Sequence, residues 1–356
     1  MVFARLVGSA YAVSGAQSIL GHAPTARRRA CLAGIAILSL ASLVSIPICQ
    51  ASCRLEEISE FHVELVGNSP IIDGEINGQP IRIVLDTGSN ISHLTRTAAR
   101  QLNLPLRSEV DRGMVGPEGY NSVLTTVIKE FKLGKMILKN YTANVAGKVI
   151  YNGNGVASFE LGADVLSEFT TEWDLAHGVV RLLHPQDCKV EQLAYWAPGY
   201  FRIDLQPQSR VDPSVEFEVH INGKSTKAEI DSGDANSHIK PKAAREVGVD
   251  PSGPDAEPAG DITGLAPQPI PTWIGRFNTF EVGGETINNA RLLIGELSLP
   301  AETEYSGTPI PMRVRAPVVH LGADFLRANR LIIVPEKHVA LFTYNGGAVF
   351  QTDHPE

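Results

Sequence analysis

The sequence predicts an all-β protein made of two copies of one folding unit. The 356-residue chain contains 32 glycines and 23 prolines among many runs of valine, isoleucine and threonine, a composition that favours short strands joined by turns. A segment of the first half, Ile81–Leu94 (IRIVLDTGSNISHL), also returns in the second half as Lys227–Ile239 (KAEIDSGDANSHI). A repeated segment of this length indicates a repeated structure, so we expect two similar lobes.

The repeat covers nearly all of both halves. The other matching elements are an Asn-Gly turn, a helix-like segment and a Leu-Gly-Ala-Asp sequence: Asn77-Gly78 with Asn222-Gly223, Thr97–Leu104 with Lys242–Val249, and Leu161–Asp164 with Leu321–Asp324. Asn-Gly between two apolar runs is a strong signal for a two-residue hairpin. The predicted division is an N-terminal lobe at residues 54–190, a linker at 191–210 and a C-terminal lobe at 211–350.

The charge and the cysteine pattern argue against several classes of protein. The net charge is -8 and the only basic block is Arg27–Arg29, which is unlike a nucleic-acid-binding protein. No C-x-x-C pair occurs, and the histidines do not cluster with acidic residues at metal-ligand spacing. We therefore expect no nucleic-acid partner, no metal and no cofactor.

The N-terminal stretch, residues 1–51, has the pattern of an export signal. Ala30–Ile48 contains no charged residue and follows the positive cluster Arg27–Arg29, as an h-region follows an n-region. Small residues allow cleavage after Ala51. Because about 20 apolar residues can also span a bilayer, an uncleaved membrane anchor is an alternative, as is a misassigned segment. We expect the rest of the chain to be exported, as a periplasmic, secreted or membrane-anchored protein facing away from the cytoplasm.

The cysteines suggest one disulfide bond. If cleavage removes Cys31 and Cys49, then Cys53 at the start of the first lobe and Cys188 at its end remain. Export allows disulfides to form, so a Cys53–Cys188 bridge would tie the two ends of this lobe together. Two unpaired cysteines, or a lipid on Cys53, are the alternatives.

Each lobe carries an aspartate at the end of an apolar strand, before a hydroxyl residue and a glycine: Asp86-Thr87-Gly88 and Asp231-Ser232-Gly233. One such triplet alone is typical of a turn, but equivalent parts of a duplicated chain tend to meet about a two-fold axis. Two carboxylates within a few ångströms share one proton, which makes one a base and the other an acid. Such a pair can activate a water and hydrolyse an amide without a covalent intermediate. The hydroxyls of Thr87 and Ser232 are suited to bonding across the junction.

These motifs resemble those of the retropepsin-like and pepsin-like aspartic proteases. The resemblance is carried by Asp86-Thr87-Gly88-Ser89 and Asp231-Ser232-Gly233, and by an apolar-apolar-Gly element downstream of each, at Glu160-Leu161-Gly162 and His320-Leu321-Gly322. It implies two retropepsin-like β-barrel lobes in tandem, in a pepsin-like bilobal arrangement with a central cleft. It also implies an aspartic endopeptidase that is active as a monomer.

The resemblance further implies roles for individual residues. Asp86 and Asp231 would be the catalytic pair, supported by the neighbouring hydroxyl residues and glycines, Thr87, Gly88, Ser232 and Gly233. The hairpin Gly113–Tyr120 would close over the substrate as a flap, with Gly116 and Tyr120 contacting it. The substrate would be an extended polypeptide that binds as an added strand.

The second lobe departs from the family pattern. Asp234 stands where a small residue is usual, and Asp250–Pro271, in the place of the flap, is rich in proline. Asp234 would raise the pKa of the aspartate pair if it pointed at them, and would matter little if it pointed to solvent. Two alternatives therefore stay open: a peptide-binding module that has lost turnover, and lobes that each pair with their own copy in a dimer.

Several polar and aromatic residues near these motifs are interpreted as structural. Asp164 lies near the start of a short predicted helix. His93 and His238 follow inward-looking serines, Ser92 and Ser237, on strands that alternate. The aromatic residues of the linker are expected to pack at the junction of the lobes: Tyr195, Trp196, Tyr200 and Phe201.

Overall fold

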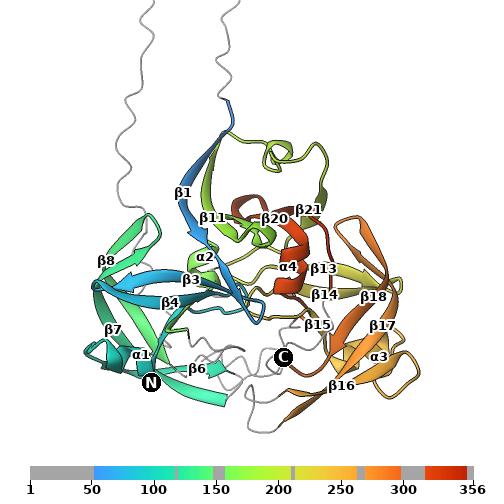
Figure 1. Ribbon diagram of the computed structural model, residues 1–356, viewed down its shortest axis with the longest axis horizontal. Helices are drawn as coiled ribbons and strands as arrows, with labels where there is room; N and C mark the ends of the chain where they lie inside the picture. The colour runs from blue at the N-terminus through green and yellow to red at the C-terminus, as the bar shows by residue number, and fades with distance from the viewer. Residues whose placement is uncertain are drawn as a thin grey trace, which may run out of the picture.

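The computed structural model describes residues 52–116, 119–146, 157–209, 213–262, 269–297 and 317–350, and in these ranges the protein is built mainly from strands (Figure 1). The predicted export segment, residues 1–51, lies outside the described residues. Among the described helices, none is both long and apolar enough to cross a membrane. The strands form three sheets, and two of these close into barrels.

The first lobe is a closed barrel of six strands, because β3 pairs with both β4 and β7. Around the ring these are β3 (Ser69–Ile76), β4 (Gln79–Leu85), β9 (Phe159–Leu161), β5 (His93–Thr95), β8 (Met136–Ala146) and β7 (Gly119–Leu133). The ring is extended by β2 (Glu64–Val66) and β6 (Arg107–Gly116) and carries the helices α1 (Arg96–Gln101) and α2 (Ala163–Leu166). Asn77 and Gly78 both have positive φ in the β3–β4 turn, as the Asn-Gly signal predicts.

The second lobe repeats this ring with the same strand order. Its strands are β13 (Glu216–Ile221), β14 (Lys224–Ile230), β19 (Val319–Leu321), β15 (His238–Ile239), β18 (Glu285–Ile294) and β17 (Ile270–Val282). The ring is extended by β16 (Ala256–Ile262) and carries α3 (Pro241–Glu246) and α4 (Ala323–Ala328). The prediction of an all-β protein with two retropepsin-like barrel lobes in tandem is confirmed.

A third sheet joins the two lobes, and the sequence analysis did not foresee it. Its order is β1 (Arg54–His62), β11 (Val179–Gln186), β10 (Thr170–Asp174), β20 (Asn329–Val334), β21 (Val339–Tyr344) and β12 (Phe201–Asp204). The two halves meet where β10 pairs with β20, and the sheet lies between the barrels at the top of Figure 1. Three short 3-10 helices connect strands here: η1 (Leu175–His177), η2 (Val190–Gln192) and η3 (Pro335–Lys337).

The segment 191–210 is more than the linker that its composition suggests, because it supplies strand β12 to this sheet. Phe201 of β12 pairs with Phe342 of β21, and their rings lie 5.2 Å apart. The largest cluster of buried apolar side chains extends through both barrels and this sheet, including Phe131, Trp173 and Phe217. Burial of this shared surface couples the lobes to each other.

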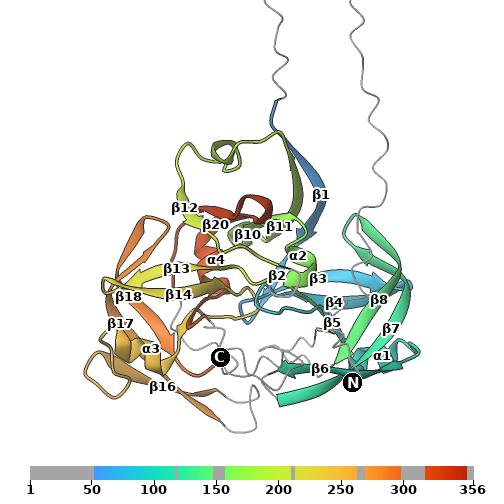
Figure 2. The same ribbon diagram turned by 180° about the vertical axis from the view of Figure 1, so that it is seen from behind.

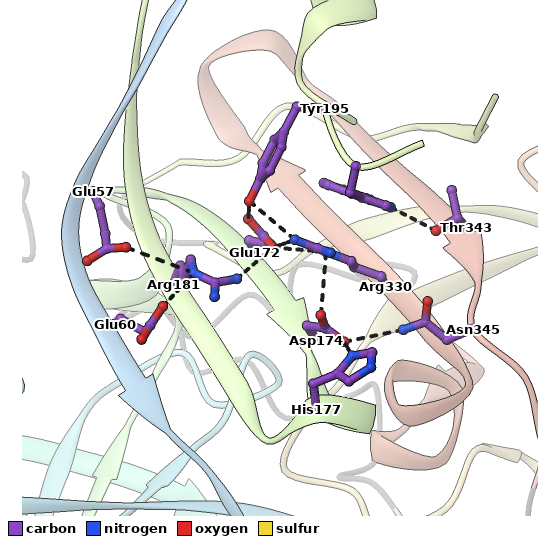
Figure 3. A network of polar contacts seen from close by, with 11 residues as sticks. Glu57, Glu60, Glu172, Asp174, His177, Arg181, Tyr195, Arg330, Thr343 and Asn345 are labelled. Carbon is purple, nitrogen blue, oxygen red and sulfur yellow. Dashed lines mark hydrogen bonds and ion pairs between the residues drawn. The ribbon is translucent and has the colours of Figure 1, made fainter. Parts of the chain in front are cut away.

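An ionic network reinforces the β10–β20 junction (Figure 3). At its centre is Glu172, whose side chain is fully buried. Its Oε1 atom accepts hydrogen bonds from Arg181 of the first lobe at 3.0 Å and from Arg330 of the second lobe at 2.5 Å and 3.0 Å. The hydroxyl of Tyr195 donates to Oε2 at 2.8 Å. One carboxylate therefore links both lobes and the connecting segment.

The linker aromatics lie at this junction, as predicted. The guanidinium of Arg330 lies 5.5 Å from the ring centroid of Tyr195 and 4.6 Å from that of Trp196. The indole N–H of Trp196 donates to Thr343 at 2.8 Å. These contacts engage the polar tips as well as the rings, which is how such side chains are usually accommodated at an interface.

The disulfide prediction is confirmed. Cys53 and Cys188 are bonded, with their Cα atoms 4.3 Å apart. The bond closes the end of the sheet at which β1 pairs with β11. The two alternatives, unpaired thiols and a lipid on Cys53, are therefore excluded in this structure.

Candidate functional site

The two aspartates of the repeated motifs occupy matching loops. Asp86 follows β4 and Asp231 follows β14. The backbone N–H of Asp86 donates to the carbonyl of Leu161 at 3.0 Å, and that of Asp231 donates to the carbonyl of Leu321 at 2.9 Å. Each loop is thus pinned to the strand that carries the apolar-apolar-Gly element, which explains why the two motifs occur together in each half.

The two loops lie against each other. A Cβ atom added to Gly88 would collide with the carboxyl group of Asp231, and one added to Gly233 would collide with the carboxyl group of Asp86. Glycine is therefore required at both positions by close approach of the opposite side chain. Each carboxyl group therefore lies against the glycine of the opposite motif, at the junction of the lobes.

The hydroxyl residues of the motifs hold the loops together. Thr87 Oγ1 donates to the carbonyl of Ile230 at 2.6 Å and accepts from the backbone N–H of Ser232 at 3.0 Å. In the reciprocal pair, Ser232 Oγ donates to the carbonyl of Leu85 at 2.8 Å and accepts from the backbone N–H of Thr87 at 3.0 Å. Both side chains are buried, so water does not compete for these four hydrogen bonds.

We expect Thr87→Val to destabilise the protein by about 2 kcal/mol, because it leaves the N–H of Ser232 and the carbonyl of Ile230 buried without partners. The shape of the side chain is nearly conserved, so the lost hydrogen bonds dominate. Urea denaturation measures the change. The matched control is Thr97→Val, since Thr97 is exposed on α1. Equal effects of the two substitutions would contradict the role of the Thr87 hydroxyl.

A second repeated clamp places the strands that follow the motifs. Oδ1 of Asp164 accepts from the backbone N–H of Ser92 at 2.8 Å and from its hydroxyl at 2.5 Å. Oδ1 of Asp324 binds Ser237 in the same way, at 2.9 Å and 2.6 Å. These contacts support the interpretation of Asp164 as structural and of both serines as inward-looking.

Burial and neighbouring charges set the protonation of Asp86. Its Oδ1 atom accepts backbone hydrogen bonds from Gly88 at 2.9 Å and Ser89 at 3.1 Å. Burial raises the pKa of Asp86 well above its usual range, and the negative charges of Asp231, Glu160 and Asp234 raise it further. These surroundings favour the protonated form of Asp86.

Asp231 has different surroundings. Its Oδ1 atom accepts from the backbone N–H groups of Gly233 at 3.1 Å and Asp234 at 3.3 Å. Its Oδ2 atom lies 3.4 Å from Nδ1 of His320, which also lies 2.8 Å from Oε1 of Glu229. Burial alone would lower the pKa of His320, but the bonds to Asp231 and Glu229 and the nearby charges raise it to about 10. A buried cation thus stands beside Asp231.

The buried cation predicts that stability depends on pH. Folding raises the pKa of His320 from 6.5 to about 10, so the stabilisation is fully present below pH 6.5 and is lost as the pH rises toward 10. We expect the melting temperature to fall from about pH 7 to about pH 9, and to fall less steeply in His320→Asn. Thermal melts across this range check the prediction, and parallel curves for the two proteins would refute it.

Asp234 points neither fully at the aspartate pair nor fully to solvent. Its Oδ2 atom lies 3.2 Å from Nδ1 of His238 and 3.8 Å from Nδ1 of His320. Burial is the main cause that raises the pKa of Asp234 to about 6. Because Asp234 also raises the pKa of Asp86, the effect anticipated for an inward orientation is present.

The two histidines of this cluster form a stacked pair. The rings of His238 and His320 are 4.4 Å apart between centroids and inclined by 9°. Burial, followed by the charge of His320, lowers the pKa of His238 well below its usual range. His238 is therefore the neutral member of the pair and His320 the charged one.

Two overlapping groups in this cluster bring potential metal-ligand atoms within 4.8 Å of one another: Asp234 with His238 and His320, and Glu229 with Asp231 and His320. A histidine nitrogen binds an ion in the plane of its own ring. Because the two rings are nearly parallel, an ion in the plane of one lies outside the plane of the other. In the group with both histidines, this geometry suits a stacked pair better than a shared ion. The expected lack of a metal stays a prediction.

The predicted flap is a hairpin. Strands β6 and β7 pair so that Val115 is opposite Tyr120 and Gly116 is opposite Gly119. The side chain of Tyr120 lies outside the described part, so its role stays a prediction. In the second lobe β16 and β17 pair in the corresponding place, in spite of the prolines. Both hairpins extend from their lobes toward the middle of the molecule (Figure 2).

The sequence analysis missed the cluster around Asp231. His320 was named there only as the first residue of the second apolar-apolar-Gly element, His238 was interpreted as structural, and Glu229 was not singled out. A signal was present, because Glu229 precedes Asp231 by two residues and alternation places both side chains on one face. Only the pairing of β14 with β19, which sets Glu229 opposite His320, brings the histidine to them.

A comparison with protein families gives one result for both lobes. A family model described as aspartyl protease matches residues 72–165 and 217–325, which together are more than half of the chain. Each matched region contains one Asp-[Thr/Ser]-Gly motif. Each ends in the short helix that follows the apolar-apolar-Gly element, α2 or α4. No curated protein matches the chain. From the two matched regions, each coinciding with a barrel, it follows that the chain belongs to the aspartyl protease family.

Proposed function

We propose that this protein is an aspartic endopeptidase in which Asp86 and Asp231 together activate one water. The observation that carries the proposal is the mutual approach of the loops, in which each carboxyl group packs against the glycine of the other motif. Membership of the aspartyl protease family supports a protease-type activity. The contrast between the surroundings of the two carboxyl groups supports separate roles for them.

In the proposed mechanism Asp231 is the base and Asp86 the acid. The Asp231 carboxylate accepts a proton from the water while the oxygen of that water attacks the peptide carbonyl. The protonated Asp86 donates a hydrogen bond, and then its proton, to the carbonyl oxygen. When the tetrahedral intermediate collapses, that hydroxyl returns its proton to Asp86 and the departing nitrogen takes the proton held by Asp231. The pair ends as it began, and water has been added across the peptide bond.

The substrate in this proposal is an extended polypeptide bound between the lobes. The β6–β7 and β16–β17 hairpins offer strand edges on both sides of such a chain. Since one chain supplies both aspartates, we propose a monomer as the active form, and dimerisation of each lobe with its own copy is not required. We also propose that the protein acts outside the cytoplasm, where the Cys53–Cys188 bond is stable.

Cleavage of an unfolded polypeptide between about pH 3 and pH 7 tests the proposal. We expect the mature protein to cut the polypeptide and the Asp86→Asn variant not to do so. Cleavage by both proteins, or by neither, would defeat the aspartate pair as the catalytic centre. Retained binding of the polypeptide without cleavage by the wild-type protein would instead favour a peptide-binding module.

A further inference from the structure

The surroundings of the two aspartates differ at two of three positions that the strand pairing makes equivalent. In the first lobe Val84 lies opposite Glu160, which in turn lies opposite His93. In the second lobe Glu229 lies opposite His320, which lies opposite His238. At the middle position the first triplet has a carboxylate, Glu160, and the second has an imidazole, His320. The two halves therefore impose opposite charges on matching positions.

His320 is held in the second lobe by two carboxylates at a single nitrogen. Its Nδ1 atom lies 2.8 Å from Glu229 and 3.4 Å from Asp231, and its side chain is 5% exposed. A buried nitrogen between two carboxylates favours the charged imidazolium. The Nε2 atom is buried without a hydrogen-bond partner in the described part of the chain. Its N–H is therefore a cost of the charged form, which the two carboxylates at Nδ1 must outweigh.

The groups that face His320 come from three elements. Glu229 and Asp231 come from β14 and the loop after it, Asp234 from the same loop, and His238 from β15. Lys240, just beyond β15, is the nearby cation acting on His238. Three carboxyl groups thus lie within 4.0 Å of Nδ1, against one neutral ring stacked on its face. The three carboxyl groups favour a positive charge on His320. His238 stays neutral, because a second charge on the stacked ring would repel the first.

Among the residues that the structure describes, no equivalent cation is paired with Asp86. At the matching position, Glu160 lies 3.4 Å from His93 and adds to the charges that favour a proton on Asp86. The cluster in the second lobe does the reverse for Asp231, because a cation favours a carboxylate. The shared proton of the pair therefore has one preferred position.

We propose that His320, held as an imidazolium between Glu229 and Asp231, is a positioning residue that keeps Asp231 a carboxylate and confines the shared proton of the aspartate pair to Asp86. This inference rests on the proposed function, since it assigns the base and the acid of that reaction. His320 itself contacts neither the substrate nor the water in the proposal. Its effect reaches the water only through Asp231.

The expected consequence is a shift of the pH–rate profile. An opposite charge within about 4–6 Å typically favours the ionised carboxylate by one to three pH units. In His320→Asn the acidic limb of kcat/KM should therefore move to higher pH by at least about one unit. In Glu229→Gln the acidic limb should move to lower pH instead, because His320 stays protonated at acidic pH and its charge then acts on Asp231 without the opposing charge of Glu229. The control is His220→Asn, which makes the same substitution at an exposed histidine on β13.

The charge of His320 is also measurable without any cleavage. In the intact wild-type protein, side-chain 15N resonances should identify one imidazolium that persists to about pH 9, absent in His320→Asn and titrating lower in Glu229→Gln. A neutral His320 at pH 7 would overturn the inference. So would an acidic limb that stays in place in both variants while their melting temperatures fall, since that pattern marks a merely structural histidine.

These two measurements separate the inference from the proposed function. If the wild-type protein cleaves no polypeptide, the proposed function fails and the 15N spectra alone decide the charge of His320. If it cleaves but His320 is neutral, the inference fails and the peptidase proposal stands. Should His320→Asn not fold, Glu229→Gln and the wild-type spectra still give the decision.

Discussion

Asp86→Asn and Asp231→Asn should each lower the rate of polypeptide cleavage by about three orders of magnitude, the range expected when a general acid or base is lost. The amide that replaces Asp231 cannot take a proton from water, and the amide that replaces Asp86 cannot deliver one to the carbonyl oxygen. Because an amide oxygen can still accept the backbone hydrogen bonds of each loop, the fold should persist. Initial rates at the optimum pH, with melting temperatures alongside, measure both effects.

The control for these variants is Asp73→Asn, since Asp73 lies on β3 with a side chain that is 91% exposed. It makes the same chemical change far from the junction of the loops and should leave the rate unchanged. If either dyad variant kept a tenth or more of the wild-type rate while folded, the proposed acid and base would be wrong. A loss confined to one of them would exclude a shared water.

Replacing Glu172 by glutamine should destabilise the protein by about 3 kcal/mol, the largest effect on stability that we expect from one substitution. Glu172 is fully buried and is the common partner of Arg181 and Arg330, whose side chains are 22% and 19% exposed. The substitution removes the negative charge but leaves both guanidinium groups at the β10–β20 junction. Breaking a buried ion pair costs more than forming it contributes, because an uncompensated charge remains.

Urea denaturation measures this effect, and Glu75→Gln is the matched control. Glu75 pairs with Lys132 at 2.9 Å on the first barrel, but its side chain is 43% exposed. A solvent-screened pair of this kind contributes at most about 1 kcal/mol. Similar losses in the two variants would show that the buried network does not join the lobes. If the free energy of unfolding falls strongly in Glu172→Gln alone, and the variant still cleaves polypeptide at low temperature, then Glu172 acts on stability and not on catalysis.

The elements that depend on local sequence were predictable. Asn77-Gly78 turns the chain between β3 and β4 because asparagine and glycine tolerate positive φ, and both residues adopt it. Alternation along the strands placed Ser92 and Ser237 inward, and each serine there binds the buried carboxylate of its lobe. Such features need only a few neighbouring residues, so a single sequence reports them.

The central sheet was not predictable in the same way. Its strands come from the start of the first lobe, the end of each lobe and the supposed linker, and no local pattern states which of them pair. The contact between Glu172 and Arg330 joins residues 158 positions apart. Only the meeting of the two barrels determines that β10 and β20 become neighbours, and therefore that this carboxylate is buried between two arginines.

The sequence by itself determined the two Asp-[Thr/Ser]-Gly loops, the repeated barrel and the glycines that permit the loops to touch, because each follows from strand alternation, turn chemistry and the repeat. The tertiary structure alone decided that the two aspartates have unlike surroundings. Glu229 and His320 meet only through the parallel pairing of β14 with β19, and charges act through distance in space, which a linear sequence does not record.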